Sequence, residues 1–517
     1  MSGRGSVLLP LTFLIFFASL PCEAQALPDG IGQFDSQQDI GTVLHAGSAH
    51  FDAERGTYSI TGSGDNVWFK SDDLHFVWTQ ALTDITLSAR IDFANSGGNP
   101  HKKAMLMVRE SLDPDSAYVD VARHGNGLTS LQYRNTTGDL TREIELNASG
   151  PPKVRIAKRG DYFYVWSAGT DGKWVYSGAS IKVEMRGGFY VGLGVCSHDK
   201  DVSETAAFSQ VHLVVAPGYS AGAVVPEKKT LYSTLEVVPI ASTDRRVVYV
   251  APAHFEAPNW LRDDSGFLVN ADGQLKRIGA KGKAPVVIGT GELKQINNDH
   301  VLSPDGTRVA ISDNTEPGGS RIYTLPLAGG QPQKVTENAP SYAHGWSPDG
   351  KTIAFCGERN GEFDVYTIPA AGGPVADKER RLTTAKGLDD GPDYSPDGKW
   401  VYFNSERRGW MQIWRMRTDG SQQDQVTNEP MNDWFPHISP DGRWMVYLAY
   451  GLDVTGHGHP ANKDVTLQLM SLADGKITLL AKLFGGQGTM NVPSWSPDSA
   501  EVAFVSYALV PDVDGKE

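Results

Sequence analysis

The sequence contains little cysteine, little positive charge and few long apolar runs, and each shortage excludes a class of protein. Three cysteines among 517 residues are too few for a disulfide-stabilised scaffold. The formal net charge is −14, whereas nucleic-acid binding requires a basic surface. Beyond residue 26 no apolar run reaches the ~20 residues of a membrane-spanning helix. We therefore expect no disulfide framework, no nucleic-acid partner and no transmembrane segment.

The common catalytic motifs are also missing. The sequence has no Gly-x-Ser-x-Gly nucleophile elbow, no phosphate-binding P-loop and no His-Glu-x-x-His zinc motif. Cys196 and Cys356 are expected in different domains, as buried thiols rather than as a disulfide or a zinc site. Catalysis would therefore need residues that the fold brings together, and a binding function is the main expectation.

Residues 1–26 have the features of a cleaved export signal. Arg4 gives a positive start, residues 7–20 form an apolar run, and Ala24-Gln25-Ala26 is a small-x-small cleavage site. Cys22 follows Pro21, which does not fit a lipoprotein box. We expect a periplasmic or secreted protein, of bacterial type because it lacks disulfides.

The first half of the mature chain, residues 27–215, has the pattern of a β-sandwich. Apolar and polar residues alternate along residues 85–93 and 189–195, as in half-buried strands. Turn signals interrupt these runs, and no long amphipathic helix is present. Residues 216–232 begin with an Ala-, Gly- and Pro-rich stretch and are expected to form a linker.

The second half, residues 233–517, repeats. Ser-Pro-Asp-Gly or a close variant recurs five times, and the residue before each copy is apolar or aromatic. With a degenerate first copy, these anchor residues are 42, 44, 48, 44 and 57 residues apart: Trp260, Leu302, Trp346, Tyr394, Ile438 and Trp495. That period is typical of a four-stranded propeller blade. We predict six blades in an all-β chain, the sixth closed by strands from both ends (234–240, 246–252 and 505–507).

These repeats resemble the TolB-type six-bladed propeller, whose blade signature is xxWSPDGxxIAFxS. The front half resembles the laminin-G-like or concanavalin-like jelly rolls of exported carbohydrate-active proteins, through Arg109, residues 162–166 and residues 190–193. TolB has a small α/β domain before its propeller, which its envelope partners use. Because this chain has a β-sandwich there, we do not expect a Tol–Pal-type role. Oligogalacturonate lyases also resemble the propeller, and this likeness implies a metal and histidines in the central funnel.

Strand direction predicts which loops share a face of the propeller. Loops before the first strands and after the second strands meet on one face, whereas the Ser-Pro-Asp-Gly turns lie on the other and are expected to be structural. The mouth on the first face is expected to collect polar and aromatic side chains, the usual signature of a site. The candidate ligand-binding residues are Asn298, Asp299, Tyr342, Asp390, Arg407, Arg408, Trp410, Asp433, Trp434 and Asn491.

Histidines near the anchors suggest a divalent metal in the channel. His300 and His344 both precede their anchor by two residues, and His437 and Asp390 could join them. The alternative is that these groups cap backbone amides and line a water-filled channel. The aromatic and arginine side chains could instead bind sugar rings and uronate carboxylates. Their alternative is packing between blades and pairing with Glu358 and Glu406.

Two functions remain open from the sequence. The first is an exported binding protein that recognises a polysaccharide, a glycoconjugate or an envelope protein through the propeller mouth and the jelly roll. The second is a metal-assisted polysaccharide lyase or glycoside hydrolase, with His300 or His344 as base.

Overall fold

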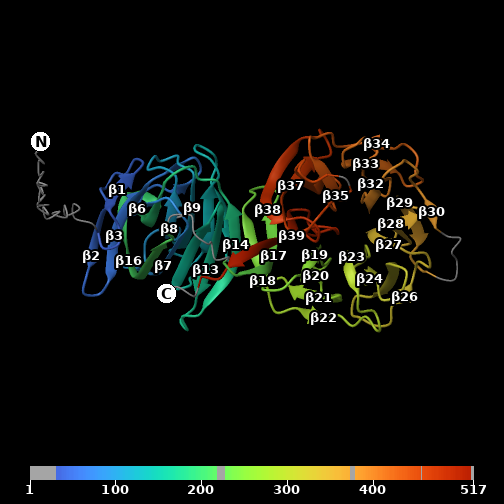
Figure 1. Cartoon of the computed structure of the whole chain (residues 1–517), viewed down its shortest axis with the longest axis horizontal. Helices are drawn as coiled ribbons and strands as arrows, with labels where there is room; N and C mark the ends of the chain where they lie inside the picture. Colours follow the sequence, from blue (N-terminus) through green and yellow to red (C-terminus); the bar gives the residue numbers. More distant parts are fainter. Residues whose placement is uncertain (1–30, 218–226, 373–378, 456, 514–517) are drawn as a thin grey trace, which may run out of the picture.

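The computed structural model describes residues 31–217, 227–372, 379–455 and 457–513 (Figure 1). The predicted signal peptide, residues 1–26, lies outside these ranges. The described residues form strands and turns without any helix, so the prediction of an all-β chain is confirmed. It follows that no helix in these ranges is long and apolar enough to cross a membrane.

The front half consists of two sheets and a short hairpin. One sheet has the order β1 (Ser36–Ile40), β6 (Leu74–Ala81), β15 (Phe189–Cys196), β8 (Lys103–Arg109), β9 (Tyr118–His124), β10 (Thr129–Arg134) and β11 (Arg142–Glu145). The other has the order β14 (Trp174–Lys182), β13 (Tyr162–Ala168), β12 (Lys153–Arg159), β7 (Ile85–Phe93), β16 (Asp199–Val215), β3 (Thr57–Gly64) and β2 (Ser48–Asp52). The hairpin pairs β4 (Val67–Trp68) with β5 (Ser71–Asp72).

The two front sheets share one apolar core. Ile85, Leu87, Ala89 and Ile91 of β7 are buried in it, as their alternation predicts. Side chains from β8, β9 and β15 of the other sheet fill the same cluster. Removing this apolar surface from water on folding stabilises the pair of sheets.

Five separate four-stranded antiparallel sheets form the propeller blades (Figure 1). The first contains β19 (Glu256–Trp260), β20 (Gly266–Ala271), β21 (Gln274–Gly279) and β22 (Val286–Val287), and the second β23 (Ile296–Leu302), β24 (Arg308–Asp313), β25 (Arg321–Pro326) and β26 (Gln333–Lys334). The third contains β27 (Ser341–Trp346), β28 (Thr352–Arg359), β29 (Glu362–Pro369) and β30 (Arg380–Arg381), and the fourth β31 (Asp389–Tyr394), β32 (Trp400–Ser405), β33 (Gln412–Arg417) and β34 (Asp424–Gln425). The fifth contains β35 (Asn432–Ile438), β36 (Trp444–Tyr450), β37 (Lys463–Ser471) and β38 (Ile477–Gly485).

The strands predicted for a sixth blade do not form a separate sheet. β17 (Lys229–Pro239) pairs with β18 (Arg245–Ala251) and, along eleven residues, with β39 (Glu501–Pro511). β18 also pairs in parallel with β11, through Ile144 with Arg245 and Glu145 with Arg246. The three strands therefore extend the front sheet to ten strands, and the separate blades number five where six were predicted. Residues 229–232, expected in the linker, lie in β17.

The contact between the two halves contains an apolar cluster. Tyr164, Trp166 and Tyr176 of the front half pack in one buried cluster with Ala508 and Val510 of β39. The ring of Tyr176 contacts that of Tyr232 edge to face at 4.9 Å. Removing these aromatic and aliphatic side chains from water stabilises the contact between the two halves.

Candidate ligand-binding site

The Ser-Pro-Asp-Gly turns are built by their own side chains. The Ser347 hydroxyl donates to Asp349 Oδ1 at 2.6 Å, and the backbone N–H of Lys351 donates to the same oxygen at 3.1 Å. The same pair of contacts recurs at Asp305, Asp397, Asp441 and Asp498. The repeated aspartates therefore have the structural role that the sequence predicts.

The first strand of each separate blade has a β-bulge just before its anchor residue. The register shifts between Ala343 and Gly345 in the third blade and between Asp390 and Asp393 in the fourth, with equivalent shifts in the other three. Gly391 has φ +62° and Phe435 has φ +55°, in the left-handed region. Because a bulge redirects the side chains around it, residues at the same distance from their anchors can point in different directions.

His344 and two aspartates from neighbouring blades form a buried charged cluster. Nε2 of His344 lies 3.1 Å from Oδ1 of Asp390 and 4.0 Å from Oδ1 of Asp299. The ring of Phe435 stacks on the imidazole with the centroids 6.1 Å apart. The cluster thus brings together the second, third, fourth and fifth blades. We name Asp299, His344 and Asp390 the channel cluster.

The pKa values of the channel cluster differ because its members interact. Burial alone would lower the pKa of His344, but the Asp390 and Asp299 carboxylates raise it to about 9. Burial alone would raise the pKa of Asp390, but His344 lowers it to about 2. Burial raises the pKa of Asp299 to about 7. At neutral pH the cluster therefore holds an ionised Asp390–His344 pair and an aspartate that is close to its own pKa.

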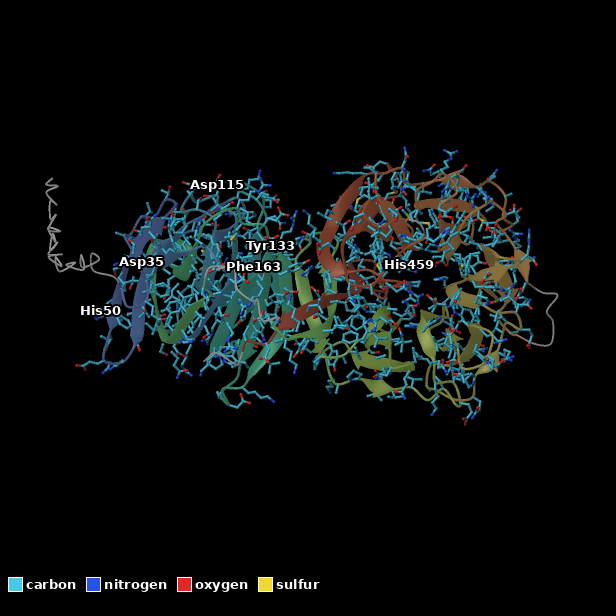
Figure 2. All side chains as sticks on the ribbon, in the orientation of Figure 1. Asp35, His50, Asp115, Tyr133, Phe163 and His459 are labelled. Carbon is cyan, nitrogen blue, oxygen red and sulfur yellow. The ribbon has the colours of Figure 1, made fainter. Side chains whose placement is uncertain are left out.

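Aromatic and polar groups surround the channel cluster. The ring of His459 lies 4.2 Å from that of Trp434, centroid to centroid, and 5.5 Å from that of Phe435. Figure 2 shows His459 toward the middle of the ring of blades. Tyr342 is half-buried, and burial raises its pKa to about 12, with Asp299 and Asp390 adding to the rise. Predicted residues from four blades do converge here.

The three predicted metal ligands lie in different environments. His300 is fully buried, and burial lowers its pKa to about 4 although nearby backbone groups oppose this shift. His437 contacts Asp393, with Nδ1 3.3 Å from Oδ2, whereas His344 belongs to the channel cluster. Within the described ranges, no group of three or more histidine, cysteine, aspartate or glutamate side chains is arranged to hold a metal ion. The bulges turn His300, His344 and His437 toward different neighbours, although these residues lie at similar distances from their anchors.

Some predicted sugar contacts are engaged within the protein. Arg407 donates to Asp389 at 2.9 Å and to Gln423 at 2.6 Å, and its guanidinium lies over Trp414. Its ion-pair partner is therefore Asp389, whereas Glu406 was expected, and its guanidinium is already engaged within the protein. Arg408 also lies over Trp414 and donates to Gln425 at 3.2 Å. Trp410 is 49% exposed and so remains available.

The remaining predicted residues are buried. Asn298 and Asn491 are nearly inaccessible, and Asn491 accepts a hydrogen bond from the Gly488 backbone at 2.8 Å. Trp434 is fully buried against His459. Asp433 is also fully buried, and burial raises its pKa to about 8. Asp433 and Trp434 therefore contribute to the blade interior rather than to an open surface.

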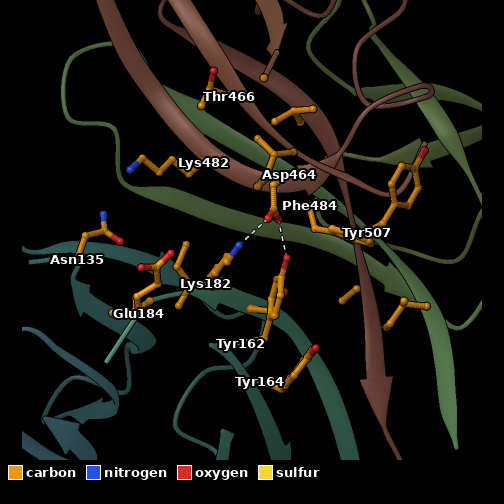
Figure 3. A pocket seen from close by; sticks show the side chains of 18 of the residues that line it. Asn135, Tyr162, Tyr164, Lys182, Glu184, Asp464, Thr466, Lys482, Phe484 and Tyr507 are labelled. Atoms are coloured by element: carbon orange, nitrogen blue, oxygen red, sulfur yellow. Dashed lines mark hydrogen bonds and ion pairs between the residues drawn. The ribbon is translucent and has the colours of Figure 1, made fainter. Parts of the chain in front are cut away.

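A second site, which the sequence did not predict, lies between the two halves. It is a cleft of about 960 Å³ between β13, β14 and the loops of the front half and β37, β38 and β39 of the propeller (Figure 3). The Tyr162 hydroxyl donates to Asp464 at 2.6 Å, and Lys182 Nζ lies 2.8 Å from the same carboxylate. The available signal was the strand of residues 162–166, which is aromatic or apolar at every position and so predicts burial on both faces.

Together, the repeated four-stranded sheets and the polar groups around their axis define a class of protein, the β-propellers. The family model described as "TolB beta propeller domain" matches residues 303–507. An uncharacterized protein of Agrobacterium fabrum is 48% identical over 279 residues, which are 54% of this chain and 93% of that protein. The solved structure of a TolB candidate from Agrobacterium tumefaciens is also 48% identical; the match covers 54% of this chain and 100% of that one, with a TM-score of 0.52. The chain therefore belongs to the TolB-like β-propeller family.

Proposed function

We propose that this chain is an exported binding protein that recognises a carbohydrate at the propeller mouth. The observation that supports this function most is the channel cluster. Its Asp390 and Asp299 carboxylates can accept hydrogen bonds from sugar hydroxyls, and Tyr342 supplies a half-buried ring and hydroxyl beside them. Trp410 offers an exposed ring for stacking on a sugar face.

The proposed organisation follows the predicted domains. We propose a cleaved signal over residues 1–26, a concanavalin-like jelly roll over 27–215 and a six-bladed propeller that starts at residue 229 rather than at the predicted 233, because β17 begins there. The shared core of two front sheets supports the jelly roll. The order β18-β17-β39, with the bridge from Trp495 to Val502, supports counting these strands as a sixth blade. The export signal supports a periplasmic or secreted location.

A glycan array probed with the chain from Leu27 onward tests the function. Asp390→Asn should weaken binding at least tenfold, because it removes the charged acceptor, and Tyr342→Phe tests the mouth without disturbing the ion pair. Asp424→Asn is the matched control, since Asp424 lies in the outermost strand of the same blade and is exposed. Unchanged binding in Asp390→Asn and Tyr342→Phe would contradict the mouth as the site. Capture of an envelope protein with no glycan bound would contradict the carbohydrate.

A further inference from the structure

We propose that the cleft between the two halves is a second binding site, specific for an oligosaccharide whose rings bear carboxylates. This site does not depend on the propeller mouth. Its residues come from both halves of the chain, so only the complete protein contains it. The volume of about 960 Å³ is at the upper end of ligand pockets and is enough for about three sugar rings.

The charge of the cleft supports an anionic ligand. The chain as a whole has a net charge of −14. In the cleft, four lysine or arginine residues (Lys182, Arg186, Lys229 and Lys482) face three acidic ones (Glu110, Glu184 and Asp464). Asp464 is already paired with Lys182. The side chains of Arg186, Lys229 and Lys482 are exposed, and in the described part of the chain no ion pair involves them. With Glu110 and Glu184 beside them, the remaining net charge of the cleft is +1, and the three exposed cations are available to carboxylates.

The aromatic side of the cleft supports sugar rings. Tyr162 and Tyr164 stack with their centroids 6.4 Å apart, and the edge of Phe484 meets Tyr162 at 6.2 Å. Tyr162 is held in place by its bond to Asp464 and by the Lys182 ammonium, 5.7 Å from its ring centroid. A ring that is fixed before binding loses little conformational freedom when a ligand stacks on it.

Polar groups opposite the aromatic rings complete the site. Asn135 and Thr137 line the cleft from the front half, and Thr466 lines it from the propeller. In Figure 3 Lys482 extends from the propeller side above Asn135 and Glu184 of the front half. Amide and hydroxyl groups can bind the ring hydroxyls while Lys482 pairs with a carboxylate. A neutral chain of the same rings would lose the second contact.

Calorimetry with two matched trisaccharides tests this proposal. The probes are β-1,4-linked trimannuronate and β-1,4-mannotriose, which differ in a carboxylate or a hydroxymethyl group on each ring. The chain from Leu27 onward should bind trimannuronate at least tenfold more tightly than mannotriose. Lys482→Glu should weaken trimannuronate binding at least tenfold without changing the melting temperature, because its side chain is exposed.

Lys476→Glu is the matched control, because Lys476 is exposed in the turn before the same strand and does not line the cleft. It should leave binding unchanged. Equal affinity for the two trisaccharides, undetectable trimannuronate binding, or unchanged affinity in Lys482→Glu would each overturn the proposal. Loss of trimannuronate binding in Asp390→Asn with normal binding in Lys482→Glu would assign the ligand to the mouth instead.

Discussion

At the scale of single residues, the channel cluster combines stability with ligand recognition. The side chains of His344 and Asp390 are buried and lie 3.1 Å apart. Removing one partner leaves the other charge buried without compensation, which costs about 3 kcal/mol or more.

His344→Gln should therefore reduce the free energy of unfolding by about 3 kcal/mol in urea titrations at pH 7. The control is His50→Gln in β2, whose imidazole forms no ion pair within the described ranges. A loss below about 0.5 kcal/mol would mean that the carboxylates are solvated and that the cluster does not behave as a buried pair.

The pH dependence of stability should report His344 separately. Because its pKa is raised to about 9, its contribution is complete below the ordinary histidine value and is lost as the pH rises through 9. Asp299, with a pKa of about 7, still titrates at the lower edge of this window and is ionised above about pH 8, whereas Tyr342 titrates only near 12. Burial lowers the pKa of His459, so that ring stays neutral there.

Stability of the wild type should fall between pH 7 and pH 9.5, and this fall should be smaller in His344→Gln. Urea titrations at steps of half a pH unit measure the difference. NMR of the imidazole protons should give a His344 pKa near 9. Parallel pH profiles for the wild type and His344→Gln would contradict the assigned pairing.

The residue scale also shows where sequence reasoning stopped. Asp299, Tyr342, His344 and Asp390 lie close together, because strand direction places the residues before the anchors on one face. Within the described ranges His300, His344 and His437 do not form a metal-ligand set. Each bulge adds a residue to one strand and changes the direction of the next side chain. The spacing between repeats in the sequence does not reveal where a bulge occurs.

At the scale of elements, the turns and strands of the blades were the most predictable part. Proline, aspartate and glycine determine the turn locally, and the repeat period then gives the blade. The pairing of β18 with β11 could not be predicted, since it depends on two residue pairs that are far apart in the sequence, Ile144 with Arg245 and Glu145 with Arg246.

The turn aspartates give a prediction at this scale. Asp349→Ala should lower the melting temperature by a few degrees, because it removes acceptors for Ser347 and Lys351, and it should leave ligand binding unchanged. Lys351→Ala is the control, since it keeps the backbone N–H that donates to Asp349 and removes only an exposed ammonium 3.7 Å from the carboxylate. Thermal melts of both variants check the difference, and identical melts would mean that the proline and glycine suffice.

The strand β39 gives a second prediction at this scale. Phe504 is fully buried between β17 and the fifth blade, so Phe504→Ala should reduce the free energy of unfolding by about 3–5 kcal/mol. Leu509 lies on the same strand but is 41% exposed, and Leu509→Ala should change it by about 0.5 kcal/mol or less. Chemical denaturation measures both losses. A loss of about 0.5 kcal/mol or less in both variants would mean that β39 stabilises the fold mainly by backbone pairing.

At the scale of the whole molecule, the ten-stranded sheet and the aromatic interface should make the two halves unfold together. Tyr164, Trp166, Tyr176 and Val510 belong to one buried cluster with members from both halves. Unfolding of either half would expose this apolar surface, so separate melting is unfavourable. Val510→Asp places a carboxylate in this cluster, where an unpaired charge is unfavourable. Calorimetry should show one transition for the wild type, moved to lower temperature in Val510→Asp. Two resolved transitions in the wild type would contradict this coupling.

The pairing of β17 with β39 also has a mechanical consequence. Lys229 pairs with Pro511 at one end of this antiparallel ladder, and Pro239 pairs with Glu501 at the other. A force that pulls residues 229 and 511 apart therefore loads the hydrogen bonds one after another, as in opening a zipper, rather than all at once. We therefore expect the β17–β39 ladder to separate at low force when residues 229 and 511 are pulled apart, beginning with the Lys229–Pro511 pair.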